Sequence, residues 1–191
     1  MLRRFWLTLP AVAWSRRYSA VPMSGPPFRR LRKPLLLARA LVAVLRVRVG
    51  LWLRSGAAVR ADIARHHSRH HSRHRASVAP TPGALREVAW SVRAAARLVP
   101  GATCLTQAHA GQLLLARRGM GSVVRLSVPA DATAGFRPHA WLIAQAGPDA
   151  VIVLGGTAAD YAVHQPLVDL AQDRSARAPR DSAPSAAALR R

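Results

Sequence analysis

The spacing of apolar residues changes from a helical to a strand-like period in the second half of the chain. Residues 84–98 and 104–118 place apolar side chains at steps of three and four, the period of a helix with one buried face. Pro100-Gly101 separates the two segments, and Gly119 follows the second, as expected of helix ends. The pattern therefore predicts two consecutive helices.

Strand-like segments follow these helices. Residues 122–128 and 139–146 alternate apolar and polar side chains, and residues 150–154 form a short apolar run. Gly147-Pro148 supplies a turn between the last two segments, and strands joined by short turns run antiparallel. We therefore predict an α+β fold in which helices pack on a small antiparallel sheet.

A basic segment, residues 28–64, precedes this core and also has a helical period. Pro34 suits the first turn, where its missing amide donor costs nothing. Arg32, Arg39 and Arg46 recur every seven residues and so share one face. This amphipathic segment either packs on the downstream domain with solvated arginines, or presents a cationic face to anionic lipid or an acidic peptide.

Between the two parts, residues 65–75 repeat an Arg-His-His-Ser unit. In a helix the repeat would place His66, His70 and His74 on one face, and histidines one turn apart can bind zinc or nickel. Tandem repetition without carboxylates, followed by the Pro and Gly of residues 79–83, instead favours a low-complexity linker. We predict a linker over residues 65–83 and a single domain over residues 84–170.

The two ends of the chain carry weaker patterns. The first residues combine a basic start with an apolar stretch, but Pro10 interrupts that stretch and arginines precede the small residues of any cleavage site. Met23 offers a later start, so we predict that residues 1–27 are either a disordered leader or an extension upstream of the true start. Residues 171–191 are predicted to be a disordered tail.

The charge of the chain is large and uneven. The net charge is +21, and 17 of the 29 Lys and Arg residues lie in residues 1–80 with a single acid, Asp62. Because nearly all basic residues are Arg and Ala is abundant, the composition matches a GC-rich bacterial genome, which weakens charge as evidence of function. Aromatic residues are not interleaved with the arginines and no binding motif appears, so we predict no specific nucleic-acid partner.

The single cysteine excludes an internal disulfide and fits a reducing compartment, so the cytoplasm is the predicted location. Cys104 follows the helix-capping residue Thr103 and falls in a first turn, where free amides and the helix dipole favour a reactive thiolate. His139 follows Pro138, which imposes an extended approach and places the imidazole at the start of a strand. A thiol and an imidazole so placed match a nucleophile and its base.

The motifs around this pair resemble a known family. They are Cys104-Leu105-Thr106, Arg117-Arg118-Gly119, the strand over 124–128, Phe136, His139-Ala140-Trp141 and Gly155-Gly156. Together they resemble the transglutaminase-like cysteine peptidases of lasso-peptide biosynthesis, the B-type leader peptidases. The likeness covers about residues 84–170. The basic N-terminal half resembles the split form of these proteins, in which a separate small protein recognises the precursor.

The resemblance implies a transglutaminase-like or papain-like core and the removal of a leader from a ribosomally made precursor peptide. Cys104 would attack the carbonyl that joins leader to core, while His139 would take the thiol proton and give one to the departing amine. The amide of Cys104 would help to bind the oxyanion. The implied partners are the precursor, the leader-recognition protein and an amide-forming lasso cyclase, with no cofactor or metal.

The third catalytic member is where the sequence departs from that family. Relatives commonly place an Asp near the end of the strand that follows the histidine strand, whereas residues 154–157 here read Leu-Gly-Gly-Thr. Asp160, in the next loop, is the first candidate, and a backbone carbonyl that orients the ring is the second. Asp149 would pair near Ala146, roughly 20 Å from His139 at the rise of a strand, and is predicted to be a surface acid.

Two other functions remain open. One is a basic nucleic-acid- or membrane-associated protein whose transglutaminase-like region is inactive, supported by the charge of residues 1–80. The other keeps the thiol but transfers the acyl group to an amine, as transglutaminases do. Binding that collapses with salt and ignores Cys104→Ala would favour the first, and product masses separate the second from hydrolysis.

Overall fold

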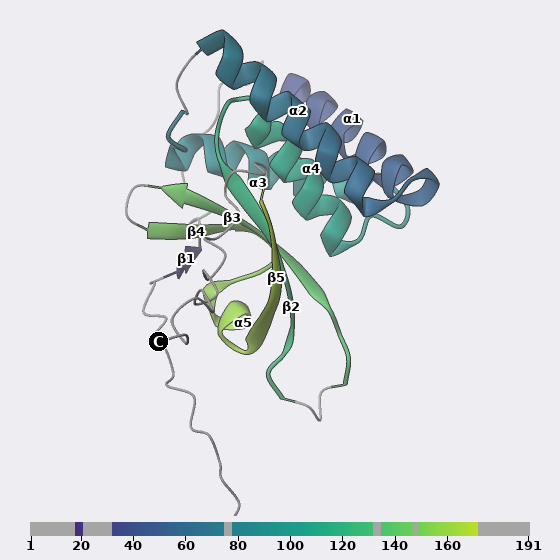
Figure 1. Cartoon of the computed structure of the whole chain (residues 1–191), viewed down its shortest axis with the longest axis vertical. Helices are drawn as coiled ribbons and strands as arrows, with labels where there is room; N and C mark the ends of the chain where they lie inside the picture. The colour runs from purple at the N-terminus through teal and green to yellow at the C-terminus, as the bar shows by residue number, and fades with distance from the viewer. Residues whose placement is uncertain (1–17, 21–31, 75–77, 132–134, 147–148, 172–191) are drawn as a thin grey trace, which may run out of the picture.

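The computed structural model describes residues 18–20, 32–74, 78–131, 135–146 and 149–171. Helices α1 to α4 gather on one side of a sheet, and the short helix α5 lies beside the strands away from them (Figure 1). The helices are α1 (Arg32–Leu53), α2 (Gly56–His74), α3 (Pro82–Ala96), α4 (Cys104–Ala116) and α5 (Ala158–Ala162).

The sheet has five strands in the order β1-β4-β3-β2-β5. Strands β2 to β5 pair antiparallel, and the three-residue β1 adds to β4 in parallel. The strands are β1 (Tyr18–Ala20), β2 (Ser122–Pro129), β3 (His139–Ala146), β4 (Asp149–Leu154) and β5 (His164–Ala171). The predicted α+β class, with helices on a small antiparallel sheet, is confirmed.

The predicted elements of the second half agree closely with the observed ones. Strands β2, β3 and β4 match their predictions to within one residue at either end, and helices α3 and α4 to within two. Strand β5 was not predicted because it contains Pro166 and is largely exposed, which is tolerated in an edge strand. The Gly147-Pro148 turn and most of the predicted leader and tail lie outside the described residues.

Helix α1 belongs to the same hydrophobic core as the rest of the fold. Its residues Ala40, Ala43, Val44 and Val47 are buried in one cluster with residues of α3, α4 and the sheet. The segment therefore packs on the downstream elements, which is the first of the two interpretations given by the sequence. Among the described helices, none combines the length and apolarity needed to cross a membrane.

Helix α2 runs through most of the His/Arg repeat, where the sequence predicted a linker. Val59, Ile63 and His67 lie four residues apart and are buried, and the ring of His70 packs against Gly119. The repeat is helical through His74, and its histidines His67 and His70 pack against the rest of the protein. In the described part of the chain, no three His, Cys, Asp or Glu side chains group as a metal site requires.

The Pro and Gly segment after the repeat is the start of α3 and not only a linker. Thr81 caps the helix, its side chain accepting from the amide of Ala84 at 3.3 Å, and Pro82 occupies the first turn. These residue types are common both in loops and at helix starts, which explains the difference from the prediction.

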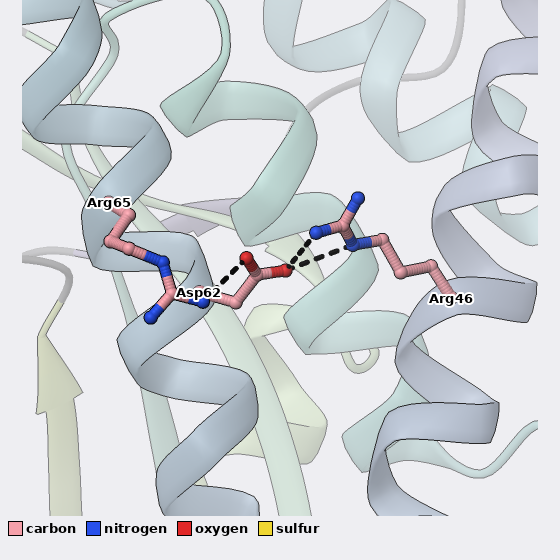
Figure 2. Close-up of polar contacts among 3 residues, drawn as sticks. All are labelled: Arg46, Asp62 and Arg65. Atoms are coloured by element: carbon pink, nitrogen blue, oxygen red, sulfur yellow. Dashed lines mark hydrogen bonds and ion pairs between the residues drawn. The ribbon is translucent and has the colours of Figure 1, made fainter.

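Asp62 of α2 is joined to α1 by Arg46, and it also pairs with Arg65 of its own helix (Figure 2). Its carboxylate accepts from Arg46 Nη2 at 2.6 Å and Nε at 2.9 Å, and from Arg65 Nη2 at 3.0 Å. Desolvation alone would raise the pKa of Asp62, but the hydrogen bonds and charge of Arg46 and Arg65 hold that pKa below its usual range. The one acid of residues 1–80 therefore fixes two cationic helices to each other.

Helix α4 crosses the sheet at close range. A Cβ atom at Gly111 would lie 2.5 Å from Leu142 Cδ2 and 2.8 Å from Leu154 Cδ1, so only glycine permits this approach. Leu142 and Leu154 are almost fully buried and have little room to move. This contact sets the position of α4 over β3 and β4, and thereby the position of its first residue, Cys104.

Candidate functional site

Cys104 is the first residue of α4, as predicted. Thr103 caps the helix, its hydroxyl accepting from the amide of Thr106 at 3.3 Å. The cysteine is a free thiol, is partly exposed, and packs against the edge of the main core cluster. The positive end of the α4 dipole therefore lies at the sulfur-bearing residue and favours negative charge there.

His139 begins β3, where it pairs with Ser127 of β2. Its ring contacts Trp141, two residues along the same face, with centroids 4.6 Å apart and the rings tilted by 59°. Trp141 is 1% exposed, and its Nε1 donates to Ser127 Oγ at 2.7 Å. A fixed indole thus supports the imidazole from beneath.

Cys104 and His139 line one cavity of about 440 Å³. The cavity lies where the start of α4, the end of α3, the start of β3 and the turn after β4 meet. It is lined by Arg93, Ala96, Arg97, Cys104, Gln107, His139, Gly155 and Gly156. The structure therefore brings both predicted residues, and the Gly-Gly pair, to a single cleft.

A backbone carbonyl orients the histidine ring. His139 Nε2 lies 2.7 Å from the carbonyl oxygen of Gly155, and a carbonyl can only accept, so Nε2 carries the proton of the neutral ring. Nδ1 is then the nitrogen with a free lone pair, which is the form a general base requires. Of the two orienting groups that the sequence left open, the carbonyl is the one hydrogen-bonded to the ring.

Gly155 adopts a conformation that suits glycine alone. Its φ is +120°, and a Cβ atom there would lie 3.1 Å from both the carbonyl oxygen of Ala140 and the Cα of Trp141. Both neighbours are backbone atoms next to His139 in β3, so they cannot move aside without distorting the strand. The turn that presents the Gly155 carbonyl therefore depends on a missing side chain.

We expect Gly155→Ala to destabilise the protein by about 1–3 kcal/mol, because alanine is strained at this φ. The same backbone shift should displace the carbonyl from His139 and lower the reactivity of Cys104. Urea unfolding and the rate of Cys104 alkylation measure the two effects. Gly83→Ala is the matched control, because a Cβ atom there meets nothing within 4 Å. Equal behaviour of the two variants would show that residue 155 tolerates a side chain.

Asp160, the first candidate for the third member, caps α5. Its Oδ2 accepts from the amide and the hydroxyl of Thr157, each at 2.7 Å. These hydrogen bonds, first the backbone one and then the hydroxyl, lower the pKa of Asp160, with a smaller contribution from the charges of His139 and His164. The carboxylate thus lies in the electrostatic range of His139, while it accepts its hydrogen bonds from Thr157. A catalytic role for Asp160 remains a proposal.

Asp149 pairs with Ala146 in the register of β3 and β4, as the sequence analysis expected. That position is at the opposite end of β3 from His139. Strand geometry therefore separates Asp149 from the cavity.

The chain matches the profile of a known protein family. The profile described as the transglutaminase-like superfamily matches residues 41–169, which is more than half of the chain. The chain belongs to the transglutaminase-like superfamily. This superfamily commonly holds cysteine peptidases and transglutaminases. Searches of curated proteins and of solved structures gave no significant match.

The transglutaminase-like match begins inside α1, ahead of the predicted domain start at residue 84. This agrees with the burial of α1 in the common core. Most of α1, whose charge suggested a segment separate from the domain, therefore lies within the region that matches the family.

Behind His139, the transglutaminase-like domain carries a polar and aromatic cluster that the sequence analysis did not assign to the site. The ring of His164 lies 5.9 Å from that of His139 and 5.4 Å from Trp141, and its Nδ1 donates to the carbonyl of Asp160 at 2.8 Å. Tyr161 meets Trp141 edge-on at 5.2 Å. The cluster fixes Trp141 from the side of the sheet opposite the main helices.

Arg125 supports this cluster from β2. Its guanidinium donates to both carboxylate oxygens of Asp169 at 2.5 Å, and also to the hydroxyl of Tyr161. Residues 125 and 169 are direct partners across β2 and β5, and the arginine side chain is 9% exposed. The alternation in residues 122–128 predicts that Arg125 lies on this face. Its partner Asp169 could not be predicted, because β5 was not predicted as a strand.

Proposed function

We propose that this protein is a cytoplasmic cysteine peptidase that removes the leader from a ribosomally made lasso-peptide precursor, without a cofactor. The observation that carries the proposal is the cavity shared by Cys104, at a capped helix start, and His139, whose Nε2 is held by the Gly155 carbonyl. Membership of the transglutaminase-like superfamily supports the cysteine chemistry.

The reaction would proceed through an acyl-enzyme. Cys104 Sγ attacks the carbonyl carbon between leader and core as its proton passes to His139 Nδ1, and the oxyanion accepts from the amide of Cys104. The carbon–nitrogen bond then breaks, and the proton on Nδ1 goes to the leaving amine of the core. Water attacks the thioester, which frees the leader carboxylate and returns a proton to the thiol.

The lasso-peptide assignment is supported by the motifs that the sequence shares with the B-type leader peptidases. Cys104, His139 and Gly155-Gly156 line the cavity, and Trp141 lies directly beneath the imidazole. The proposed partners are the precursor peptide, a separate leader-recognition protein and an amide-forming cyclase, which would receive the new core amine.

The test is incubation of the protein with a precursor peptide and the leader-recognition protein encoded beside it, followed by mass analysis. We expect two fragments whose masses together exceed that of the precursor by one water. A product in which the leader is joined to an amine would instead establish acyl transfer. An uncut precursor in the presence of both partners would contradict the proposal.

A specific surface also favours contact with an anionic membrane. Leu35, Val42, Leu45, Val49 and Trp52 follow one another at steps of seven, three, four and three along α1 and are 44–74% exposed. Arg39 and Arg46 flank this stripe, so apolar and cationic groups face outward together. The arginines disfavour a second copy of the same surface and complement anionic headgroups.

We expect the protein to co-sediment with vesicles containing phosphatidylglycerol and not with vesicles of phosphatidylcholine alone. Trp52→Glu should weaken this binding about tenfold, because a charge replaces the most exposed aromatic ring of the stripe. Val163→Glu is the matched control, since Val163 is 61% exposed on the other side of the fold. Equal binding by the two variants, or tighter binding to nucleic acid than to anionic vesicles, would exclude α1 as a membrane contact.

A further inference from the structure

We propose that the α3 side of the cavity is an anion subsite, which receives a substrate carboxylate beside the bond attacked by Cys104. The charge and placement of the described residues carry this inference. Only the identification of the carboxylate as part of a peptide substrate rests on the proposed function.

Two guanidinium groups line the cavity from one helix. Arg93 and Arg97 are four residues apart, so they project from the same face of α3 one turn from each other. Ala96 beside them is small and leaves this wall open, and none of the eight lining residues is acidic. A guanidinium binds a carboxylate through paired hydrogen bonds, which makes this wall suited to a planar anion.

A third guanidinium lies against the turn that leads to Cys104. Gly101 has a φ of +71°, and a Cβ atom there would meet Arg48 Nη2 at 2.8 Å. Arg48 comes from α1 and is only partly exposed. The positive charge of α1 thus reaches the α3–α4 turn, where it adds to the dipole at the start of α4.

The side of the cavity formed by Gly155 and Gly156 has a negative charge behind it. A Cβ atom at Gly156 would lie 2.9 Å from Asp160 Oδ2, so this carboxylate stands behind the Gly155-Gly156 turn. Its hydrogen bonds to Thr157 fix its direction. The cavity is therefore cationic at α3 and anionic behind the glycines, and an anion that enters it is directed to Arg93 and Arg97.

The first test compares two alkylating reagents on the only cysteine of the chain. In each reaction the thiolate sulfur forms a bond to carbon and iodide leaves. Iodoacetate carries a carboxylate into the cavity, and iodoacetamide, a neutral analogue of similar size, does not. We expect the ratio of the iodoacetate rate to the iodoacetamide rate to exceed that of a free cysteine peptide.

Arg97→Gln should lower this ratio by about three- to tenfold, because one cation near the entering carboxylate is lost. Arg86→Gln is the matched control: it removes the same charge from α3 about three turns earlier, outside the cavity. Thermal unfolding confirms that both variants remain folded. An unchanged ratio in Arg97→Gln, or equal slowing by both reagents, would overturn the subsite.

The second test uses peptide cleavage. Replacing an acidic residue near the cleaved bond by its amide should raise KM several-fold for the wild type and have no further effect in Arg97→Gln. If C-terminal amidation alone raises KM, the bound carboxylate is the chain terminus, which still supports the subsite. If neither change raises KM, the peptide carboxylate is not the ligand. If no precursor is cut, the proposed function fails, while the alkylation ratio still decides the subsite.

Discussion

Cys104→Ser is expected to reduce leader removal by about 10⁴-fold or more, because a hydroxyl keeps its proton in conditions under which His139 can draw one from a thiol. The fold should persist, since serine has nearly the same shape and the position is partly exposed. Mass analysis of precursor cleavage measures the first effect, and urea unfolding the second.

His139→Ala provides the companion variant, because it keeps the thiol and removes its base. The matched control is His66→Ala, which deletes an imidazole from α2 that does not line the cavity. We expect full cleavage by the control and none by the other two variants. Unchanged cleavage by Cys104→Ser or His139→Ala would rule out the proposed chemistry.

Trp141→Ala should cost about 3–5 kcal/mol of unfolding free energy, which is the usual loss for a fully buried tryptophan. The indole is 1% exposed, contacts the rings of His139, Tyr161 and His164, and donates to Ser127. Its removal leaves a void and an unpaired hydroxyl beneath the site. The protein that remains folded should also lose activity, because His139 loses its support.

The matched control is Trp52→Ala on α1, since Trp52 is 74% exposed. We expect a change within about 0.5 kcal/mol for this variant. Urea denaturation of the three proteins gives the comparison. A similar loss in both variants would mean that the burial of Trp141 does not govern stability.

The positions of Cys104 and His139 could be predicted because each depends on the residues next to it in the sequence. Threonine is a preferred capping residue, and a helical apolar period follows Thr103 directly. This places Cys104 in the first turn of the helix. Pro138 imposes an extended backbone ahead of an alternating strand, and this places His139 at the strand's start. Helices α3 and α4 and strands β2 to β4 follow from period alone in the same way.

The remaining features depend on contacts between distant parts of the chain. The partner of Arg125 is Asp169, which lies 44 residues away on an edge strand that contains a proline. The repeat in α2 is helical where His67 is buried and the ring of His70 packs against Gly119, which its composition does not reveal. Neither contact can be predicted from the spacing of residues near it in the sequence.

The main-chain oxygen of Gly155 has a consequence for how intact sites are recognised. That oxygen belongs to the main chain, so the hydrogen bond to the ring of His139 needs no acidic side chain. A sequence that lacks an acidic residue at this point therefore retains the hydrogen bond to its histidine. The absence of an acidic residue there is therefore no evidence that a chain of this kind has lost the pair formed by its cysteine and histidine.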